Sequence, residues 1–123
     1  MDVREARYDE LEIVALMVNA KEQTKLKNMF KKLIYSKEGA VVLAFDKNGE
    51  VIGILGAKND MDGMTGEDII RVILSWILPK RKGIGNPAVE MMDILKLQSC
   101  FKSNDVRFDS WLDVKDLKGI EVK

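Results

Sequence analysis

The sequence has no histidine, one cysteine and two prolines among its 123 residues. Without histidine, Ser-His and Cys-His nucleophile pairs are excluded and the commonest zinc ligand is missing. Cys100 has no second cysteine with which to form an internal disulfide, a pattern expected of a protein in the reducing cytoplasm. We therefore assign no metal site, and no catalytic role to Cys100.

The sequence also lacks long apolar runs and an excess of charge of either sign. Its longest apolar run, residues 72–78, is too short to span a bilayer as a helix, and residues 1–5 lack the layout of a secretion signal. Twenty basic and twenty acidic side chains cancel, so no overall field attracts nucleic acid or an anionic membrane. Any anion site must therefore be local.

The composition that is present suits one globular domain over residues 1–123. Hydrophobic residues make up 46% and charged residues 33%, and no repeat or linker-like stretch divides the chain. Two helices are predicted before residue 39. Asp9 and Glu12 are placed to cap the first, which Tyr8 and Ile13 would staple and which ends near Asn19. The second is indicated by apolar residues at helical spacing, namely Leu26, Met29, Phe30, Leu33 and Ile34.

The middle of the chain predicts a β-hairpin. Residues 40–45 and 51–55 are β-prone runs, and Asn48-Gly49 offers the two positive-φ positions of a tight turn between them. A polar loop is expected from Lys58 to Gly66. Residues 69–78 are rich in β-branched side chains and predict a strand buried on both faces. The alternative is a helix capped at Thr65 and Asp68, which would make the protein a helical adaptor.

A basic glycine turn follows this strand. Asn86 and Pro87 then suit the start of a helix, expected to be mostly buried and to run to about Ser99, and residues 106–114 alternate as a strand does. Such an arrangement is typical of a phosphate-binding site: a strand is followed by a turn with Gly83 and Gly85 and then by a capped helix. Glycines let the backbone approach the anion, and helix-start amides and the helix dipole favour negative charge. An isolated G-x-G more often only turns the chain, so the surrounding elements carry this interpretation.

These residues resemble the GNAT superfamily of acetyl-coenzyme A-dependent N-acetyltransferases. The family signature, Gln or Arg followed by x-x-G-x-G/A between the fourth strand and the third helix, is similar to Lys80-Arg81-Lys82-Gly83-Ile84-Gly85. The order of elements from Val3 to Val114 is also similar. The resemblance implies an α/β fold with a mixed central sheet of about five to six strands flanked by three helices.

The resemblance further implies acetyl-CoA as cosubstrate and an amine as acceptor. Ile77 and Leu78 would offer backbone groups to the pantetheine arm, and amides from Arg81 to Gly85 would hold the pyrophosphate. The cofactor-binding residues are thus expected to be Ile77, Leu78, Lys80, Arg81, Lys82, Gly83, Ile84, Gly85 and Asn86.

Acetyl transfer needs a group that deprotonates the amine. Glu67 and Asp68 resemble in position the carboxylates that some family members use, although a solvated loop end or a helix cap explains them as well. The sequence departs from the family where Lys80 replaces Gln or Arg, where the link from Pro79 to Gly83 is short, and where the catalytic tyrosine after the 106–114 strand is missing. The catalytic half therefore looks truncated.

Two functions remain open at this point. One is a cytoplasmic N-acetyltransferase that binds acetyl-CoA where the strands 69–78 and 106–114 diverge. The other is a catalytically inactive relative that keeps the fold for coenzyme binding, dimerisation or inhibition of a partner. The edge of the 106–114 strand is expected to be open, which would allow pairing with a second copy as a homodimer.

Overall fold

The structure is a computed structural model that describes residues 2–15, 20–77 and 87–108. Its elements include both strands and helices, as expected of an α/β chain. In chain order they are β1 (Asp2–Glu5), the 3-10 helix η1 (Tyr8–Glu10), α1 (Leu11–Ala15), α2 (Ala20–Tyr35), β2 (Gly39–Phe45), β3 (Val51–Met61), β4 (Asp68–Ile77), α3 (Ala88–Lys96) and β5 (Val106–Phe108).

The strands in the described part of the chain form one mixed sheet in the order β1-β2-β3-β4-β5. The first four strands are antiparallel to their neighbours, and β5 runs parallel to β4. A parallel pair needs a crossover connection, and the segment containing α3 supplies it. The structure thus confirms residues 69–77 as a strand, which removes the helical adaptor.

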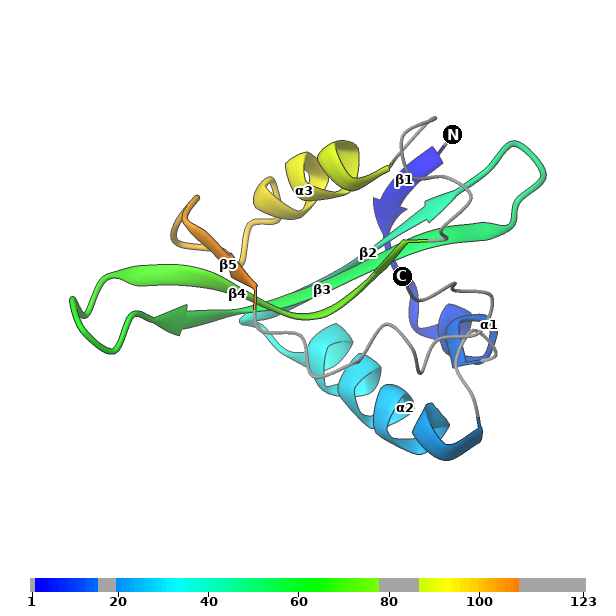
Figure 1. Ribbon diagram of the computed structural model, residues 1–123, viewed down its shortest axis with the longest axis horizontal. Coiled ribbons are helices and arrows are strands. Elements are labelled where there is room, and N and C mark those ends of the chain that lie inside the picture. The colour runs from blue at the N-terminus through cyan, green and yellow to red at the C-terminus, as the bar shows by residue number, and fades with distance from the viewer. Residues whose placement is uncertain (1, 16–19, 78–86, 109–123) are drawn as a thin grey trace, which may run out of the picture.

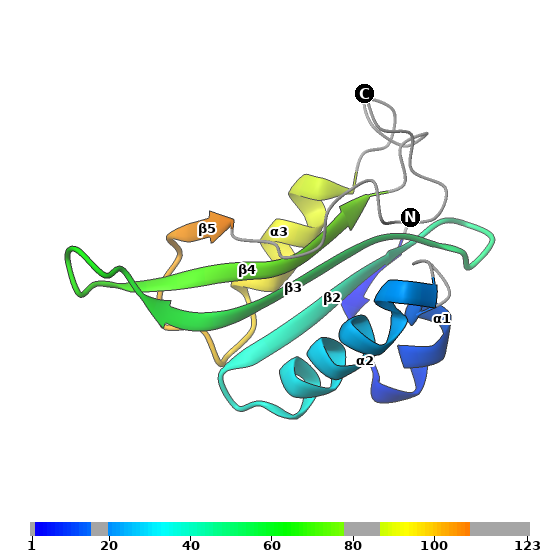
Figure 2. The same cartoon turned by 60° about the horizontal axis from the view of Figure 1, so that its bottom comes forward.

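The helices cover both faces of this sheet. α1 and α2 lie on one face and α3 lies on the other (Figure 1, Figure 2). Each face therefore has its own apolar cluster, and the strands between them alternate. Val41 and Leu43 of β2 belong to the cluster under α1 and α2, whereas Val42 and Ala44 belong to the cluster under α3.

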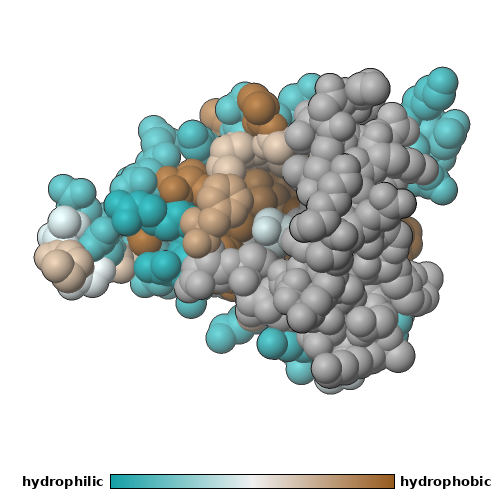
Figure 3. Space-filling view, viewed as in Figure 1, coloured by the Kyte–Doolittle hydropathy of each residue, from teal (hydrophilic) through white to brown (hydrophobic). Residues whose placement is uncertain are grey.

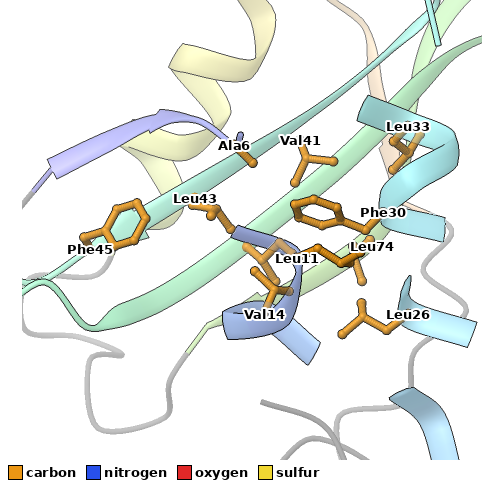
Figure 4. Close-up of a cluster of buried hydrophobic side chains, with 11 residues drawn as sticks. Ala6, Leu11, Val14, Leu26, Phe30, Leu33, Val41, Leu43, Phe45 and Leu74 are labelled. Atoms are coloured by element: carbon orange, nitrogen blue, oxygen red, sulfur yellow. The ribbon is translucent and has the colours of Figure 1, made fainter. Parts of the chain in front are cut away.

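The cluster under α1 and α2 is built around Phe30, which is fully buried (Figure 4). Burying a phenylalanine or leucine side chain stabilises a fold by about 1.5–3 kcal/mol. The helical spacing of Leu26, Phe30 and Leu33 gives α2 one buried stripe, as the sequence predicts. The buried members are Ala6, Leu11, Val14, Leu26, Phe30, Leu33, Val41, Leu43, Phe45, Ile54 and Leu74.

The start of the first helix differs from the prediction. At this helix start the Glu10 side chain caps the backbone: its Oε1 atom accepts a hydrogen bond of 2.7 Å from the Arg7 amide. The expected cap by Asp9 and Glu12 was therefore wrong. A 3-10 turn over Tyr8–Glu10 moves the helix start, because tertiary bonds to Glu10 hold that residue inward. The expected staple between Tyr8 and Ile13 is not formed, because Ile13 is exposed. Tyr8 instead contacts Tyr35, with ring centroids 5.1 Å apart and the rings tilted by 39°.

The β2–β3 hairpin is confirmed, but its turn is built differently. Gly49 has a φ of 81°, whereas Asn48 does not lie in the left-handed region. The Gly49 amide donates to the Asp46 carbonyl at 3.0 Å. The Asp46 Oδ1 atom accepts bonds from the Asn48 and Glu50 amides at 2.8 and 3.0 Å. One glycine and the Asp46 side chain therefore do what two positive-φ residues were expected to do.

β3 is longer than predicted. It continues to Met61, so residues 58–61 are strand where a loop was expected, because pairing with β4 overrides their low β-propensity.

α3 is less buried than predicted. It buries Met91 and Leu95, but Val89 and the C-cap residue Leu97 are exposed. Its buried face packs on the sheet. Pro87, and not Asn86, is its N-cap.

Candidate functional site

The parallel pair β4–β5 forms one side of the described sheet. Ile70, Arg71 and Val72 of β4 pair with Val106, Arg107 and Phe108 of β5. β4 continues for five more residues, to Ile77, whereas β5 is described as far as Phe108. Among the described residues no strand pairs with residues 73–77 of β4 on the β5 side.

A β-bulge lies in β4 just after the residues that pair with β5. Gly56 of β3 pairs with Leu74 and Ala57 pairs with Val72, so Ile73 is an extra residue on β4. As a result, both Ile73 and Leu74 pack toward the cluster under α1 and α2. A bulge bends its strand and re-aims the side chains that follow.

The start of α3 lies over the far end of the same strand. A Cβ atom on Gly53 would lie 2.8 Å from the Met91 Cε atom and 3.4 Å from the Pro87 Cγ atom, so α3 packs directly on this glycine. Gly53 is also the β3 residue that pairs with Ile77. Both ends of the 78–86 segment therefore meet at Gly53. The first turn of a helix, at the positive end of its dipole, is thereby held beside the end of β4.

Apolar side chains gather on this face of the molecule (Figure 3). They lie over α3 and β5, between the hydrophilic β3–β4 turn and the residues drawn in grey. Met92, Ile94, Phe101 and Val106 pack there as partly buried residues, and Phe108 is 61% exposed.

The structure places the sequence-predicted site residues in two groups. Ile77 is the last described residue of β4, and Leu78 and residues 80–86 lie outside the described residues. Glu67 and Asp68 are exposed at the other end of β4, beside the β3–β4 turn. Nine residues of strand separate Asp68 from Ile77, which corresponds to about 30 Å. The two expected carboxylates and the expected coenzyme end of β4 are therefore far apart.

Carboxylates and arginines near the β3–β4 turn form ion pairs that sequence reasoning missed. Arg107 donates to Asp62 at 3.0 Å and to Asp105 at 2.8 and 3.1 Å, and the Ile70 amide donates to the Asp105 carbonyl. Hydrogen bonds from the Met64 and Thr65 amides, and then from Arg107, lower the pKa of Asp62. The Arg107 guanidinium likewise lowers the pKa of Asp105. These charged pairs hold β5 against the turn, so their role is structural.

A hollow of about 430 Å³ lies elsewhere, and Cys100 contributes to its wall. Gly39 and Ala40, at the start of β2, also line this hollow. Residues 73–77 of β4 lie toward the other end of the sheet. Burial raises the pKa of the Cys100 thiol, and its Sγ atom lies 3.6 Å from the Gly39 carbonyl oxygen. Such a thiol is a poor nucleophile, in keeping with the lack of a role assigned to it.

The described residues contain neither a membrane-spanning helix nor a cluster of metal-binding side chains. None of the described helices is long and apolar enough to cross a membrane. Within residues 2–15, 20–77 and 87–108, no three side chains of the metal-binding types converge as ligands would.

Two features of the site had signals in the sequence that went unread. The bulge at Ile73 faces Gly56, and glycine inside a strand often marks a bulge or a close approach. Gly53 marks the contact with α3 in the same way. Predicting the end of β3 at Leu55 left Gly56 outside the strand.

Comparison with known proteins finds solved structures of the same fold. No protein-family model matches the sequence, and no curated protein matches it. Solved structures do match. A ribosomal-protein-alanine N-acetyltransferase from Brucella melitensis biovar Abortus 2308 superposes with a TM-score of 0.63 and 13% identity, covering 89% of this chain and 78% of that chain.

Two further structures agree with it. An aminoglycoside N-acetyltransferase in complex with CoA gives a TM-score of 0.65 and 17% identity, covering 88% of this chain and 78% of that chain. A GNAT family acetyltransferase from Staphylococcus aureus gives 0.64 and 15%, covering 89% and 85%. Identities this low establish architecture, and the architecture matches the mixed sheet and flanking helices predicted from the sequence. The chain therefore has the GNAT fold.

Proposed function

We propose that this chain binds acetyl-coenzyme A and transfers its acetyl group to an amine. The observation that carries the proposal is that β4 ends, at Ile77, beside the start of α3. In the proposal an extended thioester arm adds to the edge of β4 at residues 73–77 through main-chain hydrogen bonds, and a helix start favours phosphate groups. The acetyltransferases of the same fold, one of them solved with CoA, support this assignment.

In this proposal the coenzyme runs from α3 toward the bulge. Backbone groups of Ile77 and Leu78 bind the pantetheine arm. The 80–86 segment, which joins two ends that both neighbour Gly53, binds the pyrophosphate through its amides. Lys80, Arg81 and Lys82 add positive charge to that segment. Each of these contributions acts on binding and orientation of the thioester.

The first test is calorimetric titration with acetyl-CoA, comparing the wild type with Gly83→Asp. Aspartate adds bulk and negative charge in the proposed pyrophosphate site, so we expect affinity to fall at least about tenfold, or about 1.4 kcal/mol. Gly63→Asp is the matched control. Gly63 lies in the exposed β3–β4 turn, where a Cβ atom meets nothing within 4 Å, so this variant should bind as the wild type does.

Absence of acetyl-CoA binding by the wild type would remove the coenzyme from the proposal. Equal affinities of the Gly83→Asp and Gly63→Asp variants would instead show that the coenzyme binds elsewhere. Circular dichroism of both variants checks that the fold is retained.

The second candidate function is a coenzyme-binding protein without transfer activity. The position of Glu67 and Asp68 favours it, because a general base must come within hydrogen-bond reach of the amine. Both carboxylates are about 30 Å along the strand from Ile77. Thiol release from acetyl-CoA in the presence of a panel of amines separates the two candidates: turnover supports the transferase, and binding without turnover supports the second candidate.

The cellular setting of the proposal is the cytoplasm. The unpaired Cys100 is its basis, since a disulfide partner is missing from the sequence. Cell fractionation that recovers the protein outside the cytoplasm would contradict this part.

A further inference from the structure

The hollow beside Cys100 has charges of both signs on its walls. Its volume of about 430 Å³ is that of a pocket for a small molecule. Glu5, at the end of β1, and Lys37, just after α2, both line it, and Ile34 and Ala40 give it apolar surface. All of its lining residues belong to the described part of the chain. The hollow thus combines an acid, a base and an apolar wall.

Two helices end at this hollow. α2 ends at Tyr35, and Ser36 and Lys37 follow it into the wall. α3 ends at Lys96, and residues 98–100 form another part of the wall. The C-terminal end of a helix is the negative end of its dipole and favours a positive group. Both helix ends therefore add to the attraction of Glu5 for a cationic group.

The wall formed by β1 and the end of α3 presents acceptors. α3 packs against β1, and the Glu5 carboxylate is close enough to Cys100 to raise the pKa of its thiol further, after burial, which is the main cause. The Gln98 amide nitrogen donates to the Ile94 carbonyl oxygen at 2.9 Å. The carbonyl oxygen of the Gln98 side chain is then the atom that can accept a hydrogen bond from a ligand. A carboxylate and an amide oxygen suit an ammonium group.

The wall that follows α2 presents donors. The Ser36 Oγ atom accepts a hydrogen bond from the Glu38 amide at 3.0 Å, and its hydroxyl hydrogen can still donate. Lys37, the next residue, carries a positive charge. A hydroxyl group and an ammonium group together suit a carboxylate.

We propose that this hollow binds a small zwitterion of the amino acid class, with its ammonium at the Glu5 carboxylate and its carboxylate at the Lys37 ammonium. The ligand is a free amino acid or a dipeptide, since both carry these two charges on one small molecule. Its apolar side chain lies against Ile34 and Ala40.

This site is separate from the proposed coenzyme site. Gly39 of the hollow pairs with Lys58, and Lys58 pairs with Arg71 of β4. Ile77 lies six residues farther along β4, which corresponds to about 20 Å. The inference therefore does not depend on whether acetyl-CoA binds.

Alkylation of Cys100 by iodoacetamide reports on this hollow, because the chain has one cysteine. We take leucine and the dipeptide leucyl-glycine as probes, at a fixed alkaline pH. A probe at about ten times its Kd leaves about one tenth of the sites free, so alkylation should slow about tenfold. Protection by leucine assigns a free amino acid, and protection by leucyl-glycine alone assigns a dipeptide.

Single-charge analogues test the two ends of the ligand. Isopentylamine keeps the ammonium of leucine without its carboxylate, and 4-methylpentanoate keeps the carboxylate without the ammonium. Each should bind at least about tenfold more weakly than leucine, because each loses one charge-assisted contact. Equal protection by leucine and by either analogue would overturn the inference.

Variants assign each charge to its wall. Glu5→Gln should weaken leucine and isopentylamine but not 4-methylpentanoate, and Lys37→Gln should do the reverse. Without a probe, Glu5→Gln should make alkylation faster, because it removes a charge that raises the pKa of the thiol and so increases the thiolate fraction. Glu38→Gln is the control: Glu38 is exposed next to Lys37 and does not line the hollow, so this variant should behave as the wild type.

Two further results would overturn the inference. One is the absence of protection by both zwitterions. The other is a native wild type whose Cys100 is alkylated only after unfolding in urea, which would show that the hollow is covered in solution.

Discussion

The carboxylate of Glu10 joins three parts of the chain through its hydrogen bonds. The two guanidinium nitrogens of Arg4 donate to it at 2.9 and 2.6 Å, and the Arg7 amide donates at 2.7 Å. The Arg4 guanidinium also lies 4.5 Å from the centre of the Phe45 ring. Glu10 is only 5% exposed, so strand β1, the first helical turn and the core share one buried charge.

Replacing Glu10 with glutamine tests this contact. Glutamine keeps the shape but loses the charge and one of the two bonds with Arg4, so we expect the free energy of unfolding at pH 7 to fall by about 1–3 kcal/mol. Urea denaturation measures it. Glu12→Gln is the control: the Glu12 side chain is 75% exposed, and its pair with Lys27 at 3.3 Å should matter little. Equal losses in the two variants would contradict the role of Glu10.

The same residue sets a pH dependence. Burial raises the pKa of Glu10, but the hydrogen bonds from Arg4 and Arg7 outweigh it and bring the pKa below its ordinary value of 4.5. The folded state then binds fewer protons than the unfolded state near that value. Its contribution to stability is therefore complete above pH 4.5 and is lost as the pH falls through the folded pKa. Glu10→Gln should flatten the acid side of the stability curve.

At the scale of elements, β3 is a strand that contacts both helical layers through glycines. Gly53 faces α3, where a Cβ atom would lie 2.8 Å from the Met91 Cε atom. Gly56 faces α2, where a Cβ atom would lie 2.8 Å from the Leu33 Cδ1 atom and 3.2 Å from the Leu74 Cβ atom. These glycines set how closely each helix approaches the sheet. Only the Gly53 contact positions the proposed coenzyme site.

Gly53→Ala and Gly56→Ala form a matched pair that separates packing from binding. Each added methyl group overfills a close contact, so we expect each variant to lose about 1–3 kcal/mol of stability. Gly53→Ala should also weaken acetyl-CoA binding, because it displaces the start of α3. Gly56→Ala should bind as the wild type does. Calorimetry at a temperature where both variants stay folded makes the comparison, and identical affinities would show that α3 does not position the coenzyme.

At the scale of the molecule, β5 is an outer strand of the described sheet. Charged pairs hold it at the β3–β4 turn, and its Phe108 side chain is exposed. An outer strand presents main-chain groups that can pair with another chain, and an exposed aromatic side chain adds apolar area to such a contact. A second copy is the partner expected from the sequence.

Sedimentation velocity over a range of protein concentrations tests this association. We expect a reversible dimer in the wild type. Phe108→Asp should shift the equilibrium to monomer, because it places a charge in the contact without removing core packing. A single species of monomer mass at every concentration would contradict the dimer.

Much of the architecture followed from local pattern. The helical spacing of Leu26, Phe30 and Leu33, and the β-branched run at residues 69–77, were sufficient to predict α2 and β4. These elements are recognisable because side chains within one element repeat with its own period. Residues 58–61 were missed because their strand conformation depends on pairing with β4, which propensity does not report.

The sequence by itself determined the types of the main described elements and their order, since each depends on residues within one short segment, and it already put Glu67 and Asp68 at the opposite end of the 69–78 strand from Ile77. Tertiary structure alone decided that β4 bulges at Ile73 and that α3 starts over Gly53. These facts depend on strand register and helix contact. Register joins residues distant in sequence, and a shift of one position changes which face every side chain meets.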